Sequence, residues 1–180
     1  MAARRGLRHL RAALLGLMAS FLAASLPAAP ALAQEAARDP ALIAFGLGYY
    51  DINQRDDEAA DFRLEYRSDL ALWLIKPWAG LEATSDGALY GVAGLLADLP
   101  LGEHVVLTPG LGAGAYRDGG GKDLGAVVEF RSQIELAWRF ADASRLGLAF
   151  SHISNASLGD DNPGAEILTL YYAIPVERLF

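Results

Sequence analysis

The chain has 180 residues, no cysteine and a formal net charge of −7 at pH 7. Without cysteine it can form neither a disulfide framework nor a thiolate metal site. Its acidity argues against a nucleic-acid partner.

The first 33 residues are organised like a secretory signal. Four arginines lie within residues 4–11, an uncharged Ala/Leu-rich run covers 12–26, and ALA at 31–33 is an AxA cleavage site. An uncleaved membrane anchor is the alternative, but two prolines interrupt a run that is already short for a span of roughly 20 residues. We therefore expect cleavage before Gln34, so that residues 34–180 form one domain.

The remainder of the chain has the period of β-strands. Short runs of alternating polarity are separated by turn residues, with no helical pattern of any length and no long internal repeat. Eight runs are predicted, at 41–53, 59–68, 70–82, 89–97, 104–116, 125–140, 145–155 and 166–174. The sequence GLGAGA at 110–115 falls inside the fifth run with no helix after it, so its glycines indicate close strand packing or bending in a narrow barrel instead of a phosphate loop.

The sixth run shows how the two faces of these strands differ. Its even positions from 128 to 140 are mostly apolar, whereas Glu129, Arg131, Gln133, Glu135 and Arg139 occupy the odd ones. A soluble barrel with an apolar interior and a membrane barrel with an apolar exterior both produce this alternation.

Three features favour the membrane barrel. The runs have about the ten residues that a tilted membrane-spanning strand needs. The chain ends on Phe180, as bacterial outer-membrane barrels commonly do, and aromatic residues near strand ends fit the interfacial girdles of such barrels. These aromatic residues are Tyr49, Tyr50, Trp73, Trp78, Trp138, Tyr171 and Tyr172. We predict an all-β fold, an eight-stranded antiparallel transmembrane β-barrel of the bacterial outer membrane, which leaves no unpaired strand edge in the lipid.

The segment FSHISNASLGDDNPGAE, residues 150–166, carries the candidate site. His152 and Ser154 share parity with the lipid-facing residues of the seventh run, and Glu166 shares parity with those of the eighth. If both termini are periplasmic, all three side chains face lipid at the outer leaflet. A register in which residue numbers sum to about 320 would set Ser154 opposite Glu166 and His152 opposite Leu168, with Glu166 diagonal to His152.

These three residue types at this spacing suit acyl transfer. Ser154 would be the nucleophile, His152 the general base, and Glu166 the carboxylate that orients the imidazole. Polar residues are also common at the outer end of a barrel strand, so the pattern leaves open a non-catalytic barrel of structural or adhesion type. A soluble periplasmic lipid-binding barrel is a further alternative.

The segment FSHISNASLGDDNPGAEILTLYYAIP resembles the C-terminal hairpin of the outer-membrane lipid A 3-O-deacylase family (PagL-type), and FRSQIELAWRF resembles the strand that precedes it. The resemblance is specific over about 130–174. It implies an esterase that removes the 3-O-linked 3-hydroxyacyl chain of lipid A, with His152, Ser154 and Glu166 as the triad. It further implies that Asn155, Asn162 and Phe130 support the site, with Asn162 the better oxyanion donor. Pairing of the sixth and seventh runs across a turn at 141–144 independently puts Phe130 and Ser132 near Ser154 and His152.

The partners expected from this resemblance are the lipopolysaccharide substrate and the surrounding outer-membrane lipid. Arg117 and Lys122, in an outer loop, are candidate contacts for lipid A phosphates, although solvated loop residues would look the same. No cofactor is expected. His104 is the only histidine outside the signal besides His152, so no histidine metal cluster is expected either. The sequence leaves the oligomeric state open between a monomer and a homodimer.

Overall fold

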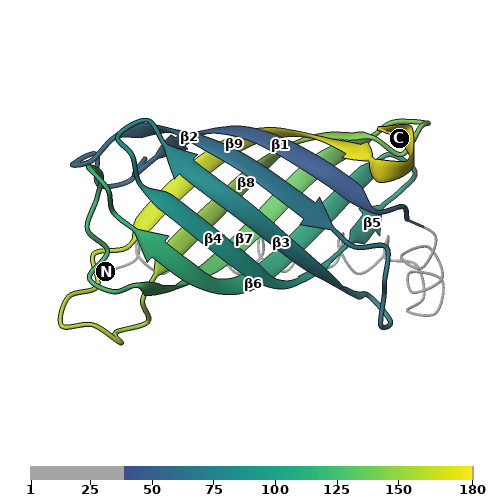
Figure 1. Cartoon of the computed structure of the whole chain (residues 1–180). Coiled ribbons are helices and arrows are strands. Elements are labelled where there is room, and N and C mark those ends of the chain that lie inside the picture. Colours follow the sequence, from purple (N-terminus) through teal and green to yellow (C-terminus); the bar gives the residue numbers. More distant parts are fainter. Residues whose placement is uncertain (1–38, 180) are drawn as a thin grey trace, which may run out of the picture.

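The computed structural model describes residues 39–179, which form a closed antiparallel β-barrel (Figure 1). Its strands are β1 (Leu42–Tyr50), β2 (Ala59–Arg67), β3 (Ile75–Thr84), β4 (Leu89–Ala97), β5 (Leu99–Leu101), β6 (Val105–Arg117), β7 (Val128–Arg139), β8 (Arg145–Ser154) and β9 (Ala165–Pro175). A short 3₁₀ helix, η1 (Val176–Arg178), follows. No helix among these residues has the length and apolarity to cross a bilayer. The proposed signal segment, 1–33, lies outside the described residues.

The barrel is eight-stranded, although nine strand segments are labelled, because β4 and β5 are consecutive parts of one strand. Both pair with β6, and only Asp98 separates them. The sheet order β4-β3-β2-β1-β9-β8-β7-β6-β5 is closed by the β4–β6 pairing. The prediction of an eight-stranded antiparallel barrel is therefore confirmed. Because Leu42 pairs with Pro175, β1 begins and β9 ends at the same end of the barrel.

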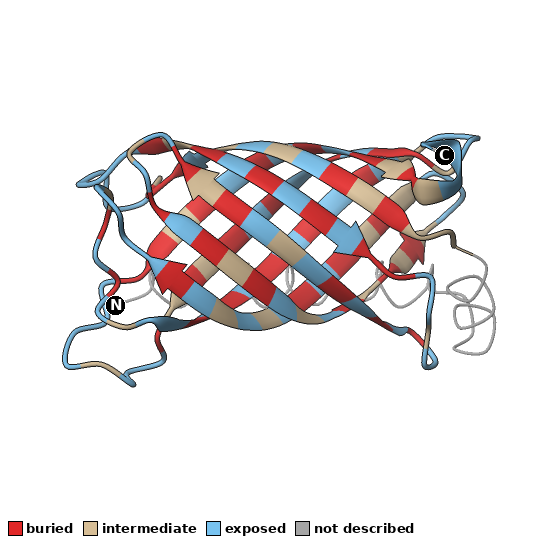
Figure 2. Cartoon of the chain, in the orientation of Figure 1, coloured by how far each residue is buried: buried red, intermediate tan, exposed pale blue. Residues whose placement is uncertain are grey.

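Side chains alternate between a lipid-facing exterior and a polar lumen, which Figure 2 shows as alternating exposed and buried positions along the strands. On β7 the even-numbered side chains are exposed, whereas Glu129, Arg131, Gln133 and Glu135 are buried. The alternative of a soluble barrel with an apolar interior is therefore wrong. Strands of nine to thirteen residues, apart from the short β5, match the length that a tilted crossing requires.

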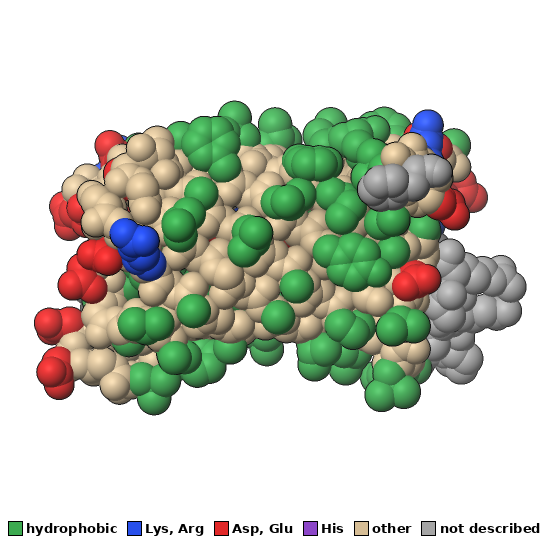
Figure 3. All heavy atoms as spheres, in the orientation of Figure 1, with side chains coloured by type: hydrophobic (Ala, Val, Ile, Leu, Met, Phe, Trp, Pro, Cys, Tyr) green, Lys and Arg blue, Asp and Glu red, His purple; other side chains and the backbone are tan. Residues whose placement is uncertain are grey.

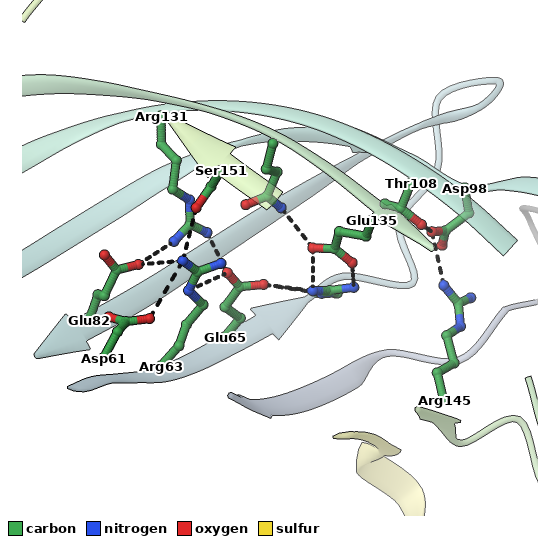
Figure 4. Close-up of polar contacts among 12 residues, drawn as sticks. Asp61, Arg63, Glu65, Glu82, Asp98, Thr108, Arg131, Glu135, Arg145 and Ser151 are labelled. Carbon is green, nitrogen blue, oxygen red and sulfur yellow. Dashed lines mark hydrogen bonds and ion pairs between the residues drawn. The ribbon is translucent and has the colours of Figure 1, made fainter. Parts of the chain in front are cut away.

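The lumen is filled by an ion-pair network (Figure 4). Arg131 binds Glu82, with 2.9 Å between Nη1 and Oε2, and also pairs with Glu65. Glu65 in turn accepts from Arg67 at 2.8 Å, and Arg67 bonds to Glu135 from β7 at 2.8 Å. Charges buried in this way are tolerated because each is compensated by a partner across the barrel, so the network ties β2, β3 and β7 together.

Two details differ from the expectation. The third strand begins at Ile75 instead of residue 70, because residues 72–75 form a tight turn in which Trp73 has a φ of +61°. Of the aromatics assigned to the girdles, Tyr50, Trp78 and Tyr171 are buried on the lumen side. Trp78 stacks there under the Arg131 guanidinium, whose Cζ lies 4.4 Å from the ring centroid.

The glycines of GLGAGA serve close strand approach, as predicted. Gly112 faces Gly94 across the β4–β6 pair, and a Cβ atom on Gly94 would overlap the carbonyl oxygen of Leu111. Glycine is required where two backbones come this close. The β4–β6 junction therefore closes the barrel through its smallest residues.

Candidate active site on the lipid-facing wall

His152 and Glu166 lie side by side on the outward face of β8 and β9. They are directly opposite in the ladder, and 3.1 Å separates His152 Nδ1 from Glu166 Oε1. The predicted register, with Ser154 opposite Glu166, is wrong by two residues. The correction brings the histidine and the carboxylate closer than the diagonal arrangement would have done.

Ser154 is the last residue of β8, two positions after His152 and on the same face. Residues at i and i+2 of a strand are about 6.6 Å apart at Cα, so the two side chains can meet. Within residues 39–179 the Ser154 hydroxyl has no hydrogen-bond partner, and its side chain is only partly buried. The hydroxyl is thus available to an incoming group.

All three side chains face outward at the loop end of the barrel. The side chain of His152 is 42% exposed and that of Glu166 is 19% exposed. The neighbouring outward positions, Phe150 and Leu168, are exposed apolar residues. Placing an ionisable pair in an apolar wall costs free energy, so this pair is a candidate functional site. The predicted lipid-facing orientation of these side chains is confirmed.

Asn155 anchors the loop that follows Ser154. Its buried amide donates to the carbonyl oxygens of Leu124 (2.8 Å) and Asp161 (2.7 Å), and its Oδ1 accepts from the backbone N–H of Ser157 at 2.9 Å. Both ends of this amide are occupied within the protein. Asn155 therefore supports the site by joining loops 118–127 and 155–164, and its amide is not free to stabilise an oxyanion.

Asn162 is held near the candidate nucleophile by a single hydrogen bond with the residue that follows Ser154. Its Oδ1 accepts from the backbone N–H of Asn155 at 3.0 Å. Within the described part of the chain its amide nitrogen makes no hydrogen bond, and the residue is exposed. The free N–H donor of Asn162 therefore belongs to a side chain that contacts the backbone of Asn155, the residue after Ser154.

Phe130 and Ser132 flank the site on β7. Phe130 is opposite Ser154 and Ser132 is opposite His152, as the sequence predicted. Both residues also line an apolar groove of about 740 Å³ whose other walls include Leu95, Leu111 and Ala113. The groove runs from the candidate triad across β7, β6 and β4, where it lies against the membrane interior.

Gly164 is a site residue that sequence reasoning missed. It has a φ of +63°, and a Cβ atom built on it would lie 2.9 Å from His152 Cε1. The glycine thus allows the loop to turn into β9 while packing against the imidazole. The sequence does contain a signal, because glycine after Asn-Pro is a turn residue, but its contact with His152 depends on the register.

Lys122 and Arg117 differ in their surroundings. Lys122 is buried and its ammonium binds Asp51 Oδ1 at 2.7 Å and Gln54 Oε1 at 2.9 Å. It is therefore part of the loop structure and does not reach lipid phosphates. Arg117 ends β6 on the outward face and is exposed.

The chain resembles known proteins in both sequence and fold. A family model described as "Lipid A 3-O-deacylase (PagL)" matches residues 60–175, more than half of the chain. The lipid A deacylase PagL of Bordetella bronchiseptica is 33% identical over 73 residues, which cover 39% of this chain and 41% of that protein. The lipid A deacylase PagL of Pseudomonas aeruginosa is 33% identical over 69 residues, covering 37% and 40%. The matched segments thus span about two fifths of the length of these relatives.

The barrel also matches solved structures. A crystal structure of the outer membrane enzyme PagL superimposes with a TM-score of 0.61 at 22% identity, covering 75% of this chain and 99% of the other. A structure from the de novo design of transmembrane β-barrels gives a TM-score of 0.56 at 9% identity, covering 76% of this chain and 94% of the other. The apolar exterior and closed sheet are those of a barrel of the bacterial outer membrane. Because the family model covers most of the barrel, this chain belongs to the lipid A 3-O-deacylase family.

Proposed function

We propose that this protein hydrolyses the ester that links a 3-hydroxyacyl chain to the 3-position of lipid A in the outer leaflet, with Ser154, His152 and Glu166 as a catalytic triad. The observation that carries the proposal is the 3.1 Å contact between His152 Nδ1 and Glu166 Oε1 on the lipid-facing wall, with Ser154 two residues along the same strand. Family membership supports the substrate class.

The chemistry follows from the roles of these groups. The contact with Glu166 holds the proton on Nδ1, so Nε2 of His152 is the basic nitrogen that accepts the Ser154 proton as Oγ attacks the ester carbonyl. The same nitrogen then donates that proton to the departing sugar oxygen, which leaves the acyl chain on Ser154. A water molecule, deprotonated by His152, releases the 3-hydroxy fatty acid and restores the serine.

The tetrahedral intermediate needs a hydrogen-bond donor for its oxyanion. Asn162 has a free amide nitrogen on a side chain that contacts the backbone of the residue after Ser154, whereas the amide of Asn155 is bound within the loops. We therefore assign the oxyanion contact to Asn162 and a positioning role to Asn155. Phe130, opposite Ser154 and at the edge of the β4–β7 groove, would guide the acyl chain to the serine.

The location of the site matches the substrate. The candidate triad is at the end of the barrel that carries loops 118–127 and 155–164, called here the loop end. This end is opposite the one at which β1 begins and β9 ends. In outer-membrane barrels the long loops are extracellular, so the loop end faces the outer leaflet. A triad on the outside of the barrel receives an acyl ester that arrives sideways through the membrane. Neither a metal nor an organic cofactor is part of this scheme.

The direct test is the mass of lipid A from cells that express the chain. Lipid A from cells with the wild type should be lighter by one 3-hydroxyacyl group than lipid A from cells with an empty vector. Lipid A from cells with an equally abundant, folded Ser154→Ala variant should keep this group. A wild type that leaves lipid A unchanged would refute the deacylase assignment. Loss of the same acyl mass in the Ser154→Ala cells would refute the choice of nucleophile.

Glu166→Gln is expected to lower kcat by about a hundredfold, because the amide no longer fixes the imidazole tautomer or stabilises its charged form. Asp160→Asn, in the adjoining loop, removes the same charge from an exposed residue and should leave the rate within twofold. Initial rates of fatty-acid release from micellar lipid A measure both. Equal rates for Glu166→Gln and the wild type would remove Glu166 from the triad.

Gly164→Ala is expected to lower kcat about tenfold, because its Cβ would displace the His152 ring at 2.9 Å. Gly102→Ala is a matched control. Gly102 also has a positive φ, +85°, but no atom lies within 4 Å of the position that a Cβ would take there, and it is at the other end of the barrel. If both variants lose the same activity, backbone strain and not the contact with His152 is responsible.

A further inference from the structure

A second groove lies on the lipid-facing wall, away from the candidate triad. It has a volume of about 840 Å³ and extends over outward positions of β1, β2, β3, β4 and β6. Exposed apolar side chains form its walls, among them Phe62, Leu64 and Leu81. The small residues Gly91 and Ala115 lie between them and form its floor. Figure 3 shows apolar side chains scattered over one such wall of the barrel, with backbone visible between them.

The middle of this groove is on the opposite side of the barrel from the triad. The strand at the middle of the groove, β3, is four strands away from β8 in either direction around the eight-stranded barrel. None of its lining residues belongs to β8 or β9. An acyl chain over Phe62, Leu64 and Leu81, at the middle of the groove, is therefore not positioned for attack by Ser154.

Arg117 forms the loop-side rim of the groove. It is the last residue of β6, pairs with Leu89 of β4 and points outward, as the parity of exposed Leu111 and buried Tyr116 indicates. Within residues 39–179 its guanidinium has neither an ion pair nor a hydrogen bond. Figure 3 shows a basic side chain between the apolar belt and the acidic tips of the loops.

The other charged residues along this groove are already compensated. Arg63 and Glu82 contribute backbone to its floor, but their side chains point into the lumen and bind each other at 2.9 Å. Arg117 is therefore the charged residue on the outward surface of the groove whose side chain has no ion-pair or hydrogen-bond partner within residues 39–179. A guanidinium at the level of the lipid headgroups binds phosphate through paired N–H donors.

We propose that this groove is a second, non-catalytic binding site for a phosphorylated glycolipid of the outer leaflet. Its acyl chains lie along the groove over Phe62, Leu64 and Leu81, and its phosphate binds Arg117. The loop end faces the leaflet whose anionic lipid is lipopolysaccharide, which makes the glycolipid and not a phospholipid the occupant. The site goes beyond the proposed reaction and does not depend on it.

Native mass spectrometry of the detergent-solubilised full-length barrel tests the proposal in a Ser154→Ala background, where no lipid is consumed. The probes are bisphosphorylated lipid A, phosphatidylglycerol and phosphatidylcholine. Arg117→Gln should weaken binding of a lipid A molecule about tenfold, as expected for loss of a hydrogen bond to a charged group. Gly91→Leu should have a similar effect by filling the groove, and the fold should tolerate it because the only atom near a Cβ at this position is Leu81 Cδ2, at 3.6 Å.

Arg55→Gln is the matched control, because Arg55 is an exposed arginine in an outer loop outside the groove. It should leave the lipid A adducts unchanged. Unchanged adducts in both Arg117→Gln and Gly91→Leu would overturn the site. Phosphatidylglycerol that binds as tightly as lipid A, with the same sensitivity to Arg117→Gln, would overturn the assignment of the occupant.

The rate of deacylation separates this site from the catalytic one. With Ser154 intact, Arg117→Gln should release fatty acid within twofold of the wild-type rate. A large loss of rate in Arg117→Gln would make Arg117 a substrate contact and overturn the proposal. A chain that releases no fatty acid at all would refute the proposed reaction, while the adducts would still report on the groove.

Discussion

Ser154→Ala is expected to lower the rate of lipid A deacylation by at least about a thousandfold, because removal of the nucleophile leaves only binding and oxyanion contacts. The variant should fold as well as the wild type. The Ser154 hydroxyl makes no hydrogen bond within the described residues and lies at the end of β8, so alanine removes no internal side-chain hydrogen bond. Initial rates with purified protein in lipid A micelles measure the loss, and the gel mobility of unheated samples reports the folded barrel.

Ser132 provides the sharpest control for this prediction. It also faces outward, on β7 directly opposite His152, and residues in such a pair have Cβ atoms about 4.5–5.5 Å apart. Geometry alone would allow either serine to give its proton to His152. Ser132→Ala should retain activity within a few-fold, and the opposite result, an inactive Ser132→Ala with an active Ser154→Ala, would move the nucleophile to β7.

A double variant tests whether the residues act as one unit. His152→Ala should be about as inactive as Ser154→Ala, and the double variant should be no worse than either single variant, because a serine without its base and a base without its serine are equally ineffective. Multiplicative losses would instead mean that the two residues contribute independently, which is inconsistent with a triad.

The sequence predicted the parts of the site that depend on parity. The period of two places His152, Ser154 and Glu166 on the lipid face whatever the register, and that placement is confirmed. The pairing of β7 with β8 was also predicted, because the short turn at 140–144 leaves little freedom in how the two strands align. These two facts suffice to bring Phe130 and Ser132 to the site.

The register of β8 against β9 could not be derived in the same way. Ten residues connect these strands, and a loop of that length is compatible with several alignments that preserve parity. The actual alignment depends on contacts across the loop, such as the bonds from Asn155 to Leu124 and Asp161. Loop 118–127, which supplies Leu124, is far away in sequence, so no local pattern contains this information.

The inward aromatics show another limit. Tyr50, Trp78 and Tyr171 were assigned to the girdles from their place near strand ends, but their parity directs them into the lumen. There the faces of Trp78 and Tyr171 pack against Arg131 and Arg67. Amphipathic aromatics suit both an interface and a polar lumen that contains guanidinium groups, so residue type alone does not distinguish the two locations.

The lumen network bears on the site through rigidity. Arg63 of β2 donates to Ser151 of β8 at 3.1 Å, and Ser151 directly precedes the outward His152 in sequence. Arg63 is also bound to Glu82, which Arg131 shares. The inner face of the site strand is therefore tied to the opposite wall, and a triad needs such support to hold its geometry.

Arg131→Met is expected to destabilise the folded barrel by about 3–5 kcal/mol, because it removes a buried cation that two buried carboxylates share. The guanidinium is fully buried, pairs with Glu65 and Glu82 and covers Trp78. Methionine fills part of the volume but leaves both carboxylates short of positive charge. Equilibrium unfolding in urea, followed by tryptophan fluorescence of the detergent-folded barrel, measures the change in the free energy of unfolding.

Two further variants decide whether charge is the cause. Arg55→Met makes the same substitution at an exposed loop position and should change the free energy of unfolding by less than about 0.5 kcal/mol. Glu82→Gln added to Arg131→Met removes one of the two carboxylates that lost a cationic partner, so the double variant should be more stable than Arg131→Met alone. If the second change destabilises the barrel further, lost packing around Trp78 and not unpaired charge accounts for the effect, and the lumen network would contribute shape more than electrostatic balance.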